Sequence, residues 1–103
     1  MPEPRITYPG LKVLNCFVNA GGKKLSGAEI TRTTGVTSGT LYPLLYRYED
    51  AGWLKSEWEV VDASEIGRPR QRLYVLTGKG KRTASSALMA LEAPGKGGLK
   101  WAF

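Results

Sequence analysis

Apolar residues recur at helical spacing in the middle of the chain, between residues 38 and 50. They fall at i, i+3, i+4 and i+7, on one side of a helix, and they are Leu41, Leu44, Leu45 and Tyr48. Thr37 or Ser38 can cap the first turn with a side-chain oxygen, and Gly52 suits the position after the last turn. The pattern predicts a helix with a buried leucine face and an outward face that contains no acid.

Three more stretches have helical patterns. Residues 11–20 and residues 77–92 each carry one apolar stripe. A third, shorter stretch starts at Ser26, has Glu29 three positions later as in a capping box, and stops at Gly35. This short helix, a turn containing glycine and the central helix together predict a helix-turn-helix unit.

Two segments after the central helix alternate between apolar and polar residues, which is typical of half-buried strands. In residues 53–60, one face of the expected strand carries Leu54, Ser56, Trp58 and Val60. Residues 70–77 alternate similarly. The intervening residues 62–69 are rich in turn formers, so the two strands are expected to form an antiparallel hairpin. The predicted fold is α+β and mostly helical: a winged helix-turn-helix whose two-stranded wing covers about residues 53–77.

The composition favours a soluble binding protein over an enzyme. The 103 residues suit one domain, and no apolar run approaches the roughly 20 residues that span a bilayer. The N-terminus lacks the pattern of a signal peptide, so we expect a cytoplasmic protein that does not bind membranes. The chain has no histidine and one cysteine, Cys16, which lies in an apolar stretch. No nucleophile–base pair, metal cluster or cofactor motif appears, so no catalytic residue, metal or cofactor is predicted.

Charge points to a polyanionic partner. The net charge is +6, and no acid lies between Ile66 and Leu91, where six basic residues fall. Hydroxyls, aromatic rings and one guanidinium on the outward helix face can contact base edges in a major groove. Arginines flanking Pro69 can reach phosphates. The predicted DNA-binding residues are Thr37, Ser38, Gly39, Thr40, Tyr42, Pro43, Tyr46 and Arg47 on the helix, and Gly67, Arg68, Arg70 and Arg72 on the wing. The alternatives are an ordinary polar helix face and a solvated basic loop.

The sequence resembles the PadR-like family of bacterial transcriptional regulators from about Leu25 to Arg82. The resemblance rests on LSGAEI, SGTLYPLLYRYEDAGWL, SEWE and GRPRQRLYVLTGKGKR. It implies a homodimeric winged-helix repressor that binds an inverted repeat in double-stranded DNA, with the central helix in the major groove, and it admits a small aromatic effector. Carried over by position, Ser38, Gly39, Thr40, Tyr42 and Pro43 would face DNA. The chain departs from the pattern in its short C-terminal helix, and in having Leu73 where a second tyrosine is usual.

The two end helices carry more apolar surface than one small core should need, so we expect them to pack against those of a second chain. The predicted dimerisation residues are Leu11, Leu14, Phe17, Val18, Ala84, Leu88 and Leu91. The alternative is that these side chains only cover their own domain. Residues 1–92 are expected to form the winged-helix domain, with the last helix at about residues 78–92, and residues 93–103 to form a flexible glycine-rich tail with an apolar end. The competing function is a winged-helix module that binds a protein partner without specific DNA binding.

Overall fold

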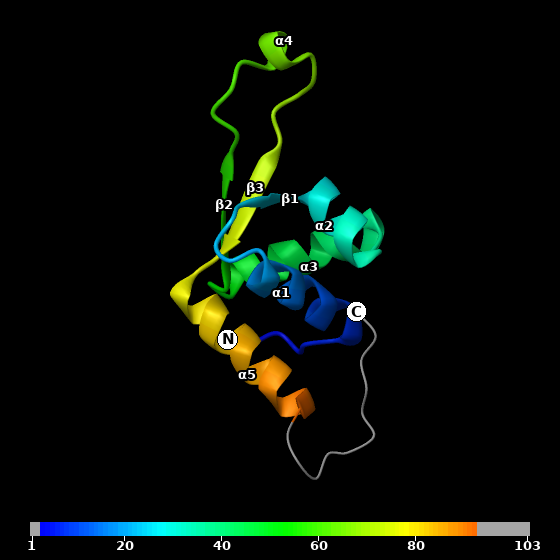
Figure 1. Ribbon diagram of the computed structural model, residues 1–103, viewed down its shortest axis with the longest axis vertical. Coiled ribbons are helices and arrows are strands. Elements are labelled where there is room, and N and C mark those ends of the chain that lie inside the picture. Colours follow the sequence, from blue (N-terminus) through cyan, green and yellow to red (C-terminus); the bar gives the residue numbers. More distant parts are fainter. Residues whose placement is uncertain (1–2, 93–103) are drawn as a thin grey trace.

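The computed structural model describes residues 3–92, and the side chains of residues 3–90. In chain order the elements are α1 (Tyr8–Asn19), β1 (Leu25–Ser26), α2 (Gly27–Thr34), α3 (Ser38–Asp50), β2 (Leu54–Trp58), α4 (Ala63–Ile66), β3 (Arg72–Leu76) and α5 (Gly78–Glu92). Figure 1 shows α1, α2, α3 and α5 gathered around the lower end of the sheet, while the β2–β3 hairpin projects away from them with α4 at its far end. This is the predicted winged helix-turn-helix, and the expected tail lies outside the described residues.

The ends of the helix-turn-helix follow local chemistry. The Ser26 hydroxyl accepts from the Glu29 backbone at 3.2 Å and the Glu29 carboxylate accepts from the Ser26 backbone at 3.1 Å, which completes the capping box that begins α2. Gly35 ends α2 in the left-handed conformation at φ 77°, where glycine has no steric penalty. Thr37 is the N-cap residue of α3, one of the two candidates that the sequence offered, but its side chain makes no capping hydrogen bond.

The sheet has three antiparallel strands in the order β1-β3-β2, one more than the sequence predicted. The extra strand, β1, pairs Leu25 with Tyr74 and Ser26 with Leu73. Two residues are too few to produce an alternating pattern, so only the tertiary pairing with β3 defines this strand. β1 fixes the start of α2 against the base of the wing.

The core lies where α1, α3 and the base of the sheet meet. Its largest fully buried side chains are Trp53 and Tyr48, whose ring centroids are 4.9 Å apart, and α1 contributes Val13 and Leu14. α1 contacts α2, α3, β3 and α5, so it is the central helix of the packing. The apolar stripe of α3 is buried as predicted, which leaves its opposite face to solvent.

The start of α5 is attached to the turn after α3. The Thr77 hydroxyl accepts from the Gly80 N–H at 3.0 Å, as a capping residue should, and donates to the Gly52 carbonyl at 2.5 Å. The Thr77 N–H donates to the Trp53 carbonyl at 3.0 Å. Gly80 packs so closely on that carbonyl that a Cβ at this position would overlap it. α5 therefore leaves the sheet in a direction fixed by backbone contacts.

The wing differs from the prediction in its outer part. β2 ends at Trp58, and the expected half-buried face is buried only at Leu54, since Trp58 and Val60 are exposed. The tip is not an irregular loop but the one-turn helix α4, capped by Asp62, whose carboxylate accepts from the Ser64 N–H at 2.9 Å. Burial ends where the helices no longer cover the hairpin, so alternation beyond that point does not reflect a buried face.

Candidate nucleic-acid interface

The outward face of α3 is exposed along its length. Ser38, Gly39, Thr40, Pro43 and Arg47 are all exposed, as is Thr37 before the helix. Tyr42 is 49% exposed and Tyr46 is 73% exposed. Residues 38–48 include no acid, so the first three turns of this face combine hydroxyls, two phenol rings and a guanidinium; the exposed acid Asp50 lies at the last residue of α3, one turn after Tyr46. A face of this chemistry can donate to and stack on DNA bases.

The ring of Tyr42 is positioned by α2. A Cβ on Gly27, the first residue of α2, would overlap the Tyr42 hydroxyl, so this tyrosine lies directly against the α2 backbone. The same tyrosine lines a groove of about 400 Å³ together with Ser26, Gly27, Ala28, Trp58, Arg70, Gln71, Arg72 and Tyr74. The groove therefore joins the exposed face of α3 to the base of the wing. The sequence predicted each face separately but not the groove between them.

Trp58 is a groove residue that the sequence analysis missed, because the alternation placed it on a half-buried face. It is 55% exposed, and the guanidinium of Arg72 lies over its ring, 5.3 Å from the centroid. The strand register pairs these two residues directly across the hairpin. An arginine stacked on an exposed tryptophan can direct those of its N–H groups that do not contact the protein toward a phosphate or a sugar. Only the strand register brings Trp58 opposite Arg72, and the sequence alone does not give that register.

A polar network ties the wing base to α3. The Arg72 Nε donates to the Ser56 hydroxyl at 2.9 Å, and this hydroxyl donates to the Glu49 carboxylate at 2.6 Å. The Arg72 guanidinium also lies 3.9 Å from that carboxylate. Glu49 belongs to α3, so these contacts fix the angle between α3 and the wing. Arg72 is therefore held by the protein rather than free to swing.

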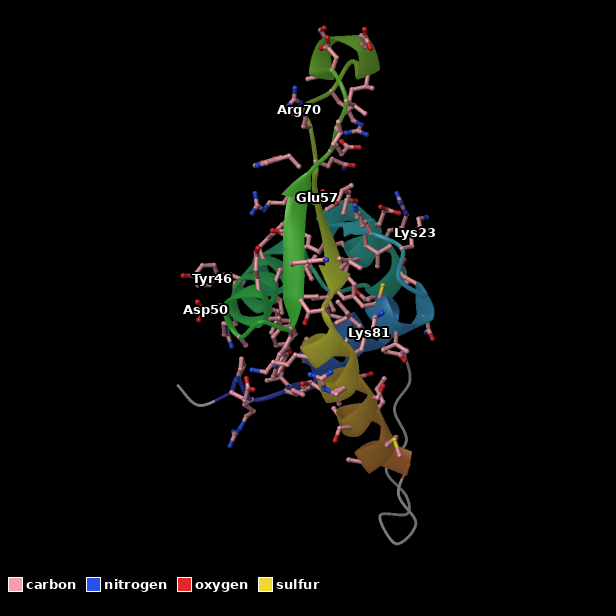
Figure 2. All side chains as sticks on the ribbon, turned by 90° about the vertical axis from the view of Figure 1, so that its left-hand side faces the viewer. Lys23, Tyr46, Asp50, Glu57, Arg70 and Lys81 are labelled. Carbon is pink, nitrogen blue, oxygen red and sulfur yellow. The ribbon has the colours of Figure 1, made fainter. Side chains whose placement is uncertain are left out.

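The other two wing arginines differ sharply. Arg68 forms a two-pronged pair with Glu59, at 2.7 and 3.0 Å, and the Gln71 N–H donates to the same carboxylate at 2.8 Å. These hydrogen bonds, first the one from Arg68, lower the pKa of Glu59 to about 2. Arg70 is exposed and has no ion pair among the described residues. Figure 2 shows Arg70 on the wing, on the same side of the molecule as Tyr46 of α3.

The predicted dimerisation residues divide by burial. Leu11, Leu14, Phe17 and Ala84 are buried within the protomer, so in this structure their side chains serve its own core. Val18 is exposed and Leu88 is half-buried, while the side chain of Leu91 lies outside the described residues. Met89, which was not in the predicted set, is 68% exposed on α5. Dimerisation stays a prediction. Among the described residues, the apolar side chains of the end helices that a second chain could contact are Val18, Leu88 and Met89.

Reactive or metal-binding chemistry is not evident among residues 3–92. Cys16 is buried, and burial raises the pKa of its thiol, which disfavours the reactive thiolate. No group of three His, Cys, Asp or Glu side chains in that range could hold a metal ion. No helix in the described part of the chain is long and apolar enough to cross a membrane. A small aromatic effector stays a prediction.

Comparisons with known proteins find similarity to one family of transcriptional regulators. The sequence profile described as "Transcriptional regulator PadR-like family" matches residues 23–86. A PadR family regulator from hypervirulent Clostridium difficile is 22% identical at a TM-score of 0.69, over 84% of this chain and 88% of that one. A PadR-like transcription factor from Bacteroides fragilis is 25% identical at a TM-score of 0.64, over 82% of each chain. A PadR family regulator from Eggerthella lenta is 21% identical at a TM-score of 0.66, over 82% of this chain and 75% of that one.

A search of curated proteins finds none that matches. The family profile nevertheless spans the helix-turn-helix, the wing and the start of α5, which are the elements that build the exposed α3 face and the groove. The match therefore covers more than half of the chain and includes every predicted DNA-binding residue. The chain belongs to the PadR-like family of transcriptional regulators.

Proposed function

We propose that this regulator is a sequence-specific repressor that binds an inverted repeat in double-stranded DNA as a homodimer. The observation that carries the proposal is the exposed face of residues 38–47 of α3, which contains no acid, beside a groove lined by Arg70, Arg72 and Trp58. One surface thus offers base-reading groups and phosphate-binding groups side by side. Specific DNA recognition needs both kinds of contact, because phosphate contacts fix orientation and base contacts give specificity.

The two halves of this surface would have different roles. The first turns of α3, with Thr40 and Tyr42, would enter the major groove, as the second helix of a helix-turn-helix does. Arg70 and the stacked Arg72 would contact the flanking sugar–phosphate backbone from the wing. Arg68 would contribute less, since its charge is already neutralised by Glu59.

The homodimer in this proposal follows from the proposed inverted repeat. One α3 helix reads a few base pairs, and two helices about 34 Å apart are needed to read both halves of a palindrome. The accessible apolar residues at the ends of the domain, Val18, Leu88 and Met89, would supply the contact. Because α5 is attached to the Gly52 turn through Thr77, a dimer through α5 would hold the two α3 helices at a set spacing.

The direct test is nuclease footprinting of the full chain on genomic fragments that include the region upstream of its own coding sequence. We expect protection of an imperfect palindrome, with nanomolar affinity and strong preference over random duplex at the same salt concentration. Equal affinity for every duplex, at any salt concentration, would contradict sequence-specific repression. Transcription from a protected promoter should fall when the protein is added to purified polymerase.

Protein docking remains the second candidate, and one observation favours it. The tip of the wing exposes Val60, Val61 and Ile66 beside two carboxylates, a composition unsuited to DNA. If docking were the whole function, retention on duplex DNA would be weak and almost independent of salt. Steep salt dependence with a specific footprint would leave the tip as a separate surface.

A further inference from the structure

The tip of the wing is an exposed apolar and acidic knob. We define it by Val60, Val61 and Asp62, which lead into the one-turn helix α4, and by Glu65 and Ile66 within that helix. Val60 is 95% exposed, and Val61 and Ile66 are each 37% exposed. Three branched apolar side chains exposed on so small an element are costly in water, and such clusters commonly mark contact surfaces. Figure 1 shows the knob at the far end of the hairpin from the helices.

The charge of the tip argues against a DNA contact. Residues 60–67 contain two carboxylates and no cation. The nearest arginine in sequence, Arg68, is engaged by Glu59 through two hydrogen bonds, so it does not offset the charge of Asp62 or Glu65. Two carboxylates next to a phosphate backbone would be repelled. The tip therefore suits a partner that is apolar and positively charged.

The described surface of this chain contains such a complement. Two adjoining hollows of about 290 Å³ each share Val75 on the sheet. Their lining includes apolar Leu73 and Val75, three lysines and one glutamate, the charged residues being Lys24, Lys55, Lys81 and Glu57. Glu57 is paired with Lys24, which leaves Lys55 and Lys81 as the excess charge. We call this the lysine-rimmed sheet surface; Lys81 and Glu57 are labelled in Figure 2.

We propose that the wing tip of one copy docks on the lysine-rimmed sheet surface of a second copy. Apolar side chains of the tip would cover Leu73 and Val75, while Asp62 and Glu65 would lie near Lys55 and Lys81. The two surfaces differ, so the contact is heterologous: each copy uses its tip on one neighbour and its sheet on another. Such contacts extend into open chains, which would link regulators bound at neighbouring sites on DNA. A dimer through the end helices is closed and cannot do this.

A charge exchange between two variants tests the contact. The tip variant is Asp62→Asn with Glu65→Lys; asparagine keeps the cap of α4, because it accepts from the same N–H. The sheet variant is Lys55→Glu with Lys81→Glu. Asp50→Lys is the matched control, since Asp50 is an exposed acid at the end of α3 outside both surfaces. Sedimentation velocity of the full chain is measured at low salt from micromolar to near-millimolar concentration, and circular dichroism checks that each variant is folded.

The unmodified chain and the Asp50→Lys control should form species heavier than a dimer as concentration rises, and added salt should reverse this. The tip variant and the sheet variant alone should each associate at least ~10-fold more weakly, because like charges then meet at the contact. Mixed together they should associate again, since the basic tip of one meets the acidic sheet of the other. Val60→Ser should weaken association without any change of charge.

Three results would overturn the proposal. The unmodified chain could stay at or below a dimer at every concentration. The mixture of variants could fail to associate beyond either variant alone. Asp50→Lys could weaken association as strongly as the tip variant, which would indicate a general charge effect. None of these results bears on specific DNA binding, which footprinting tests separately.

Discussion

The ring of Tyr42 on α3 lies against the backbone of Gly27, so that a side chain at residue 27 would occupy the place of the tyrosine hydroxyl. Gly27 is the first residue of α2, and Tyr42 is half-exposed on the proposed DNA-reading face. The contact therefore sets where a base-reading side chain points. It also explains a glycine at a helical position where nothing in the backbone conformation requires one.

We predict that Gly27→Ala reduces operator affinity by about 1 kcal/mol while leaving stability nearly unchanged. The added methyl group would turn the Tyr42 ring toward solvent, and a half-exposed ring can move at little cost. Fluorescence anisotropy with an operator duplex measures the first effect and thermal unfolding the second. In a Tyr42→Ala background the glycine substitution should have no further effect on affinity. Additive losses would show that the two residues act independently.

Base and phosphate contacts should respond differently to substitution. Thr40→Ala or Tyr42→Ala should each cost about 1–3 kcal/mol of operator binding and relax sequence preference. Arg70→Ala should weaken all duplexes alike and reduce the salt slope by about 1, because it removes one phosphate contact. Arg82→Ala is the control, since Arg82 lies on α5 and belongs neither to the exposed face of α3 nor to the lining of the groove. Unchanged operator affinity in all three interface variants would refute the placement of α3 in the major groove of DNA.

Freeing Arg68 should strengthen non-specific binding. In Glu59→Gln the amide oxygen can still accept from the Gln71 N–H, but the charge that neutralises Arg68 is removed. We expect higher affinity for random duplex and a salt slope steeper by about 1, measured by anisotropy across a salt series. Glu57→Gln is the matched control, because Glu57 pairs instead with Lys24 on the sheet. Weaker non-specific binding in Glu59→Gln would mean that the Glu59–Arg68 pair organises the DNA-binding wing.

The buried hydroxyl of Tyr48 is expected to lower the free energy of unfolding relative to a phenylalanine at the same position. This oxygen is buried and has no hydrogen-bond partner among the described residues, so Tyr48→Phe should stabilise the protein by about 1 kcal/mol at neutral pH. Burial also raises the pKa of the hydroxyl from 10.0 to about 12. The folded state then binds more protons than the unfolded state above pH 10, so stability should fall as pH rises from 10 toward 12.

Urea unfolding between neutral and alkaline pH measures both effects. The phenylalanine variant should lose less stability over the alkaline range, whereas Tyr46→Phe, at a 73% exposed position, should change neither quantity. The Tyr48 hydroxyl packs against Gly10. A destabilised Tyr48→Phe variant would indicate that this contact is favourable.

The proposed dimer is tested on α5. Met89→Glu places a charge at an exposed apolar position and should produce monomers without loss of helix, because Met89 contributes little to the protomer core. Leu88→Glu should do the same with some loss of stability, since Leu88 is half-buried. Light scattering after size-exclusion gives the mass, and operator binding should fall with dimerisation. If the unmodified protein is monomeric at micromolar concentration and still protects a palindrome, the end-helix dimer is refuted.

Local patterns in the sequence determined most of the fold. Leu41, Leu44, Leu45 and Tyr48 fixed the buried face of α3, and thus the exposed face opposite, because one helical period decides both. Ser26 with Glu29, and Gly35, fixed the ends of α2 for reasons that lie within a few residues of each helix end. The winged helix-turn-helix class followed from these elements in order.

Only the tertiary structure decided how distant residues meet. The strand register placed Arg72 over Trp58, and the packing of α2 on α3 placed Gly27 against Tyr42. Arg68 pairs with Glu59, whereas Arg70 has no ion pair among the described residues. The sequence pattern did not distinguish these two arginines. Burial of Leu11, Leu14, Phe17 and Ala84 in the protomer was likewise a matter of packing. Helical and strand periods report which face is buried, but they carry no information on which surface covers it, since that depends on contacts between residues far apart in the chain.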